Sequence, residues 1–270
     1  MLSFWNPDHV QPTGLVDRKT RDNANVWSSQ VGQDRTISSL FAAYADDPPF
    51  FVDLAANHPL FLSNTRPLER DFGWRGLCVD ADEMLAAELV ERRACAVAQA
   101  IVGSGREKAR FKPAPDDGHS AAVKAPDGGT GQITRRLDDL LTQAGAPTRI
   151  QYLSLDVEGF EDEVLLTFPL EGWTGWTFEA MTIERPSQKL RSHLRHHRYT
   201  YIGDHGWFGD SFWVHESFKG GVARAAEVRN ASVKEWGREH CKIMKPFMQS
   251  IMTKSGSAGE WARLACSGLI

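Results

Sequence analysis

The sequence lacks any apolar run long enough to cross a bilayer, and its first residues contain no basic segment followed by an apolar one. A membrane-spanning helix needs about 20 mostly apolar residues, and a secretory signal peptide needs both of those N-terminal parts. We therefore expect no membrane span, and the cytoplasm is the expected location.

An excess of positive charge is also missing. The chain has 31 Lys and Arg against 35 Asp and Glu, which gives a formal net charge of −4. Proteins that bind nucleic acid by neutralising phosphates are usually basic. A small-molecule acceptor is therefore the expected partner, and nucleic acid is not.

Cysteine is scarce and scattered. The four cysteines are widely separated, and no two form a CxxC pair: Cys78, Cys95, Cys241 and Cys266. Disulfide-rich domains and zinc sites have closer and more regular spacing. We predict neither a disulfide framework nor a zinc site.

What the sequence does contain is typical of a globular protein. Of its 270 residues, 41% are hydrophobic and 24% are charged. That length suffices for one large α/β domain with a proper core. Intrinsic disorder of the whole chain is excluded by this composition.

Apolar runs alternate with segments of helical periodicity. This alternation, with the pair 198–202 and 211–215 near its end, predicts a Rossmann-like, doubly wound, mostly parallel sheet of about seven strands that closes with a C-terminal antiparallel β-hairpin. The five apolar runs that we interpret as parallel strands are 50–54, 77–80, 95–102, 150–156 and 180–184.

Three regions follow from this pattern. Residues 1–28 form an irregular N-terminal lead, residues 29–218 form the α/β domain, and residues 219–270 form a helical extension. Within the domain, residues 103–132 are rich in Gly, Pro and Asp and predict a surface excursion with one edge strand at 109–112. The extension predicts a long amphipathic helix that packs on the domain or, alternatively, contacts a second subunit or a partner protein.

Acidic residues stand at the ends of the predicted strands. Asp53, Asp80 and Asp156 each close a strand, and ligands of doubly wound sheets bind beyond the carboxyl ends of the strands. Asp80, at the second strand, is placed to accept hydrogen bonds from both hydroxyls of a ribose. The alternative is that Asp53 and Asp80 only cap the helices that follow.

The loop after the first strand has no GxGxxG pattern. Ala55, Ala56 and Asn57 stand where a dinucleotide-binding protein needs glycines close to an anionic pyrophosphate. Small residues beside the carboxylate of Asp53 are better suited to a nucleoside with a cationic centre. The loop therefore favours an adenosyl sulfonium ligand over a diphosphate.

Candidate catalytic residues are Asp156, Glu158 and His205. Asp156 and Glu158 lie two residues apart, an arrangement that can remove a proton from an acceptor hydroxyl or hold a divalent ion, although Glu158 can instead cap the next helix. His205, in the link between the hairpin strands, titrates near neutral pH, although a lone loop histidine is more often exposed to solvent. The sequence requires no metal.

Four segments carry a resemblance to a known family: 29–34, 52–65, 152–161, and 181–184 together with 210–214. With them the chain resembles an FkbM-type methyltransferase over roughly residues 27–218. The resemblance implies the class I methyltransferase fold, S-adenosylmethionine as cofactor, and methyl transfer to an oxygen of a sugar or other small natural product. It implies cofactor contacts for Gln33, Asp53, Ala55, Asn57, Asp80 and Asp156.

The chain departs from the family pattern at 55–59, where many members have a glycine and an Asn-Asp or Asp-Gly pair. Two other functions remain open. One is a binding module for adenosylmethionine or another nucleoside that has lost catalysis and acts through a partner. The other is an NAD-dependent oxidoreductase, against which the absence of GxGxxG and of a Tyr-xxx-Lys pair both count.

Overall fold

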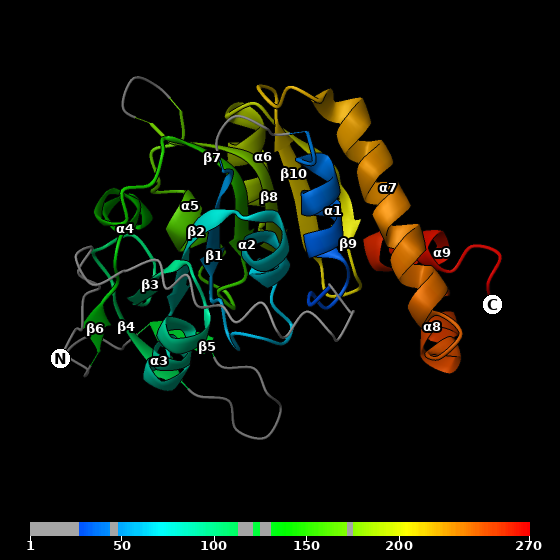
Figure 1. Cartoon of the computed structure of the whole chain (residues 1–270), viewed down its shortest axis with the longest axis horizontal. Helices are drawn as coiled ribbons and strands as arrows, with labels where there is room; N and C mark the ends of the chain where they lie inside the picture. The colour runs from blue at the N-terminus through cyan, green and yellow to red at the C-terminus, as the bar shows by residue number, and fades with distance from the viewer. Residues whose placement is uncertain (1–26, 44–47, 113–120, 125–130, 172–174) are drawn as a thin grey trace.

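A seven-stranded sheet forms the centre of the protein (Figure 1). The computed structural model describes residues 27–43, 48–112, 121–124, 131–171 and 175–270. The predicted lead, residues 1–28, lies outside these ranges except for its last two residues. The strand order is β3-β2-β1-β7-β8-β10-β9, and only β10 runs antiparallel to its neighbours. The prediction of a mostly parallel α/β sheet of about seven strands is confirmed.

The central strands are buried because helices cover both faces of the sheet, as parallel strands require. All five residues of β1 are buried, and six of the seven in β7. This double burial explains the continuous apolar runs of the sequence. The strands of the sheet are β1 (Phe50–Leu54), β2 (Arg75–Asp80), β3 (Ala96–Gln99), β7 (Arg149–Leu155), β8 (Thr177–Glu184), β9 (Tyr199–His205) and β10 (Asp210–His215).

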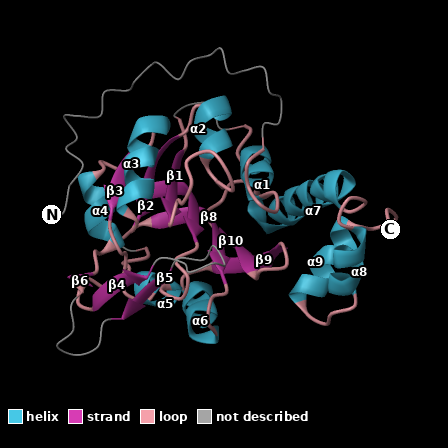
Figure 2. Ribbon diagram, turned by 90° about the horizontal axis from the view of Figure 1, so that it is seen from below, coloured by secondary structure: helices cyan, strands magenta, loops and turns pink. Residues whose placement is uncertain are grey.

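Helices lie on both sides of the sheet (Figure 2), and a hydrophobic core fills the space between the helices and the sheet on each side. Helices α4 (Leu137–Gln143), α5 (Glu161–Leu165) and α6 (Gln188–His196) contribute apolar side chains to one of these cores. The other receives side chains from α1 (Gln33–Leu40), α2 (Arg66–Phe72), α3 (Glu83–Arg92) and the first half of α7 (Gly221–His240).

Local sequence signals set several helix boundaries. Asp82 caps α3 by accepting hydrogen bonds from the main-chain N–H groups of Met84 and Leu85, which satisfies donors that a helix start leaves unpaired. Gly73 ends α2 with a left-handed φ of 71°, a conformation that glycine adopts without steric cost. These signals set the end of α2 and the start of α3, and so the lengths of the loops that join these helices to β2.

The excursion after β3 contains a second sheet. Its three strands, in the order β5-β4-β6, are antiparallel where they pair. The one strand that we predicted here, at 109–112, corresponds to β4. The bounds are β4 (Lys108–Lys112), β5 (Ala121–Lys124) and β6 (Gln132–Ile133).

The C-terminal extension folds into three helices rather than one long one. Helix α7 packs along α1 and β9, and α8 (Lys245–Met252) and α9 (Ser257–Ala265) gather at its far end (Figure 1). Trp236, Trp261 and Met248 form a core there, joined by Val31 from the domain. The helical period of the sequence continued across the break at 241–244, so periodicity alone did not reveal it.

The cysteine prediction was wrong, because two disulfides form. Cys78 in β2 bonds Cys95 just before β3, and Cys241 at the end of α7 bonds Cys266 after α9. Pairs separated by 17 and 25 residues have no spacing signature, so only the fold brings them together. Disulfides persist chiefly in oxidising compartments and are rare in the cytoplasm. The two bonds therefore count against the predicted cytoplasmic location, which stays a prediction. Within the described ranges, no helix has the length and apolar character of a membrane span.

Candidate functional site

A cavity of about 250 Å³ opens at the carboxyl ends of the parallel strands. It lies where the strand order reverses, between β1 with its neighbour β2 on one side and β7 on the other. Ligands of open α/β sheets bind at this switch point. The predicted site residues that line the cavity are Gln33, Asp53, Ala55, Asn57, Asp80, Asp156 and Glu158.

The loop after β1 turns sharply over the cavity. Ala55 and Asn57 have left-handed φ values of 60° and 54°, and for alanine that conformation costs about 1–2 kcal/mol. Main-chain bonds hold the turn: the Ala56 N–H donates to the Val79 carbonyl at 3.0 Å. The loop thus presents small side chains to the cavity in a conformation that glycine normally adopts.

Asp80 fastens this loop to β2. Its Oδ2 accepts the Asn57 N–H at 2.8 Å and its Oδ1 accepts the Asp82 N–H at 2.9 Å. Burial raises the pKa of the carboxyl, while these two hydrogen bonds lower it. A carboxylate has about four acceptor positions, so Asp80 keeps two for a ligand in the cavity.

Asp53 takes part in a buried polar network. The Thr65 hydroxyl donates to Asp53 Oδ2 at 2.5 Å, and Arg93 Nη2 donates to the same hydroxyl oxygen at 2.9 Å. Arg93 also pairs with Glu69 at 2.6 Å, with both side chains buried. Burial raises the pKa of Asp53, and the Thr65 hydrogen bond and the Arg93 charge oppose that rise. Asp53 therefore joins the start of α2 to β1 as well as lining the cavity.

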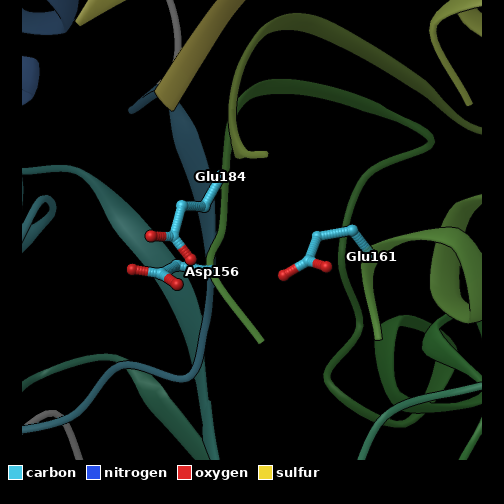
Figure 3. A group of neighbouring side chains, drawn as sticks. All are labelled: Asp156, Glu161 and Glu184. Atoms are coloured by element: carbon cyan, nitrogen blue, oxygen red, sulfur yellow. The ribbon is translucent and has the colours of Figure 1, made fainter. Parts of the chain in front are cut away.

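Acidic side chains gather at the part of the cavity next to β7, β8 and β10, and Figure 3 shows two of them, Asp156 and Glu184, with the neighbouring Glu161. Oxygen atoms of Asp156, Glu161 and Glu184 lie within 4.8 Å of one another. Asp210 stands opposite Glu184 across the antiparallel β8–β10 pair. Burial, and then the neighbouring Glu184, raises the pKa of Asp156 well above its usual range and that of Asp210 to about 7.

The capping role that was the alternative for Glu158 belongs to Glu161. Glu161 accepts the main-chain N–H groups of Val157 and Gly159 at 3.1–3.2 Å ahead of α5, so it serves the turn that we assigned to Glu158 in the capping alternative. Glu158 sits at the rim with a left-handed φ of 51°. Arg185 Nη2 bridges it to Glu184, at 2.7 Å and 2.6 Å.

His205 is not at the cavity. It lies at the end of β9 with no exposed surface, and burial followed by the Arg229 charge lowers its pKa to about 3. An imidazole that stays neutral to such acidity and does not line the cavity is a poor proton acceptor for a ligand there. The expected loop position was wrong because β9 extends three residues beyond the apolar run at 198–202.

Several cavity residues were missed. Glu184 closes a predicted strand, so the signal that identified the three aspartates also applied to it. Asp210 begins the antiparallel strand β10, and only the β8–β10 register brings it to this edge. Asn64 donates to the Ser154 hydroxyl at 3.0 Å, and both line the cavity. No local pattern marked them.

An open α/β sheet whose acid-lined cavity lies at the strand-order switch defines a class of protein that binds a small ligand at this edge. Comparison with known families then identifies the chain more narrowly. The methyltransferase FkbM domain matches residues 55–202, more than half of the 270 residues. The protein belongs to the FkbM methyltransferase family, as its sequence predicted. None of the curated proteins compared with it matches the chain.

Proposed function

We propose that the protein is an S-adenosylmethionine-dependent methyltransferase that methylates a hydroxyl of a sugar or another small natural product. The observation that carries the proposal is the position of Asp80 and the Ala55–Asn57 turn at one end of the cavity. They lie beside the strand-order switch, in a chain of the FkbM family.

The residues at this end fit a nucleoside with a cationic centre. Asp80 has free acceptor positions for the ribose hydroxyls, and Ala55 and Ala56 leave room for close approach. Asp53 adds a second carboxyl group, and no Lys, Arg or His is among the described side chains that line the cavity. A diphosphate would face carboxylates without a cation, which disfavours a dinucleotide. Bound S-adenosylmethionine supplies an electrophilic methyl group.

The acid-lined end of the cavity suits the acceptor. Asp156 and Glu158 line it, and in this proposal one of them takes the proton that the acceptor hydroxyl loses as its oxygen is methylated. Glu158 is the better placed to pass that proton to solvent, because its side chain is 25% exposed. Phe160 and Phe208 complete the wall and limit the entry of water. Positioning and desolvation are then the main contributions of the protein.

Isothermal titration of the full chain with S-adenosylmethionine, S-adenosylhomocysteine and NAD tests the proposal. Both adenosyl ligands should bind, and Asp80→Asn should weaken them at least tenfold. Asp139→Asn, an exposed position on α4 outside the cavity, is the matched control and should bind as wild type does.

Absence of binding of both adenosyl ligands would contradict the proposal. Binding of NAD alone would favour an oxidoreductase. Binding without transfer of labelled methyl to any hydroxyl in an acceptor screen would favour a module that has lost catalysis. Loss of catalysis would be consistent with the altered loop after β1. Ala55 there adopts a left-handed conformation, at a loop where many family members have glycine.

A further inference from the structure

The cluster of Asp156, Glu161 and Glu184 has the dimensions of a cation site. Two oxygens bound to one Ca²⁺ or Mg²⁺ at about 2.1–2.5 Å lie at most about 4–5 Å apart. One oxygen from each of the three side chains falls within 4.8 Å of the other two. Figure 3 shows Glu161 directed at the other two carboxyl groups from across the gap.

A buried oxygen of the cluster is a second indication that a cation binds here. Asp156 Oδ1 is buried and has no hydrogen-bond partner. Asp210, only 8% exposed, adds a further buried carboxyl group to the same cavity. A buried carboxylate oxygen without a donor is costly, and a bound cation satisfies it.

The surroundings of the cluster already orient its members. Main-chain N–H groups of Val157 and Gly159 hold Glu161, and Arg185 holds Glu184 from the rim. Hydrogen bonds of this kind orient the ligands of metal sites. Arg185 is one basic side chain against five carboxyl groups, so acidic groups outnumber it here: Asp156, Glu158, Glu161, Glu184 and Asp210.

We propose that Asp156, Glu161 and Glu184 bind a divalent cation with oxygen preference, such as Mg²⁺, Ca²⁺ or Mn²⁺, at the acceptor end of the cavity. The binding claim stands without the proposed reaction. If the methyltransferase function also holds, the cation contacts the acceptor hydroxyl and lowers the pKa of that hydroxyl. Asp156 then acts as a ligand rather than as a base, and Glu158 receives the proton.

The test is an electron paramagnetic resonance titration of the full, chelator-stripped chain with Mn²⁺ alone. We expect one bound Mn²⁺ with a dissociation constant below about 1 mM, the weak limit of natural calcium modules, displaced by excess Mg²⁺ or Ca²⁺. Glu184→Gln and Glu161→Gln come from different elements and should each weaken binding at least tenfold. Glu163→Gln, on the same helix as Glu161 but outside the cluster, should not.

Absence of a bound Mn²⁺ in the wild-type chain would overturn the proposal, as would binding that both cluster variants leave unchanged. Adenosylhomocysteine titration of the same samples separates this result from the proposed function. Metal binding without adenosyl binding supports the cation site alone, and adenosyl binding without metal leaves the methyltransferase proposal standing and removes the cation site.

Discussion

The buried histidine of β9 offers a direct test of the packing of the sheet edge. His205 has no exposed surface, and its ring packs edge-on against Phe212 with centroids 5.6 Å apart. Burial, with the Arg229 charge adding to it, lowers the pKa of His205 from 6.5 to about 3, and a main-chain contact with Val31 opposes the shift. The perturbation is His205→Gln, which removes the titrating group and keeps a neutral polar side chain.

The sign and size follow from proton linkage. An unfolded histidine binds a proton near pH 6.5, whereas folded His205 does so only near pH 3. The unfolded state therefore binds more protons between these values, and His205 destabilises the fold as the pH falls below 6.5. Between pH 8 and pH 5 the loss is about 2 kcal/mol, a large share of the about 5–15 kcal/mol that stabilises a typical domain.

Urea unfolding at pH 8, 6 and 5 measures this effect. The difference in the free energy of unfolding between wild type and His205→Gln should shift by about 2 kcal/mol in favour of the variant on going from pH 8 to pH 5. Other groups, such as Asp210, titrate in both proteins and cancel in the difference. His196→Gln, at an exposed position on α6, controls for the substitution.

Parallel stability curves for wild type and His205→Gln would refute the reasoning, since they require His205 to be exposed or paired in solution. A shift of the opposite sign would mean that the folded state holds the proton. Either result would also make His205 a candidate base again, because the argument against that role depends on the burial of its ring.

Three further predictions concern the C-terminal helices and the loop after β1. Removing the Cys241–Cys266 bond by Cys241→Ser with Cys266→Ser should lower the free energy of unfolding by about 2–4 kcal/mol, and a urea midpoint equal to wild type would show that the bond does not form. Ala55→Gly relieves a left-handed alanine and should keep or raise stability, by up to about 1 kcal/mol, in thermal unfolding; a clear loss would contradict the turn geometry. Thr65→Val leaves Asp53 without its hydroxyl donor and should cost about 1–3 kcal/mol, with Thr65→Ser restoring most of it in the same assay.

Local chemistry made much of the fold predictable. The apolar runs at 50–54 and 150–156 became β1 and β7 with bounds within a residue, because strands buried on both faces need unbroken apolar sequence. Asp80 and Asp156 could be placed at one edge for a simple reason. The carboxyl ends of parallel strands meet, so a residue that closes one strand lies near a residue that closes another.

Other features depend on contacts between distant segments. The sequence of two antiparallel strands does not show which residues will face each other across the pair. Only the pairing of β8 with β10 brings Asp210 opposite Glu184. The helical periodicity of the sequence did not indicate the break between α7 and α8. The sequence by itself determined the parallel strands of the central sheet, the aspartates at their ends and the family. The tertiary structure decided the disulfide pairs, the burial of His205 and the convergence of the acid cluster, because each requires side chains that are far apart in the chain to share one small volume.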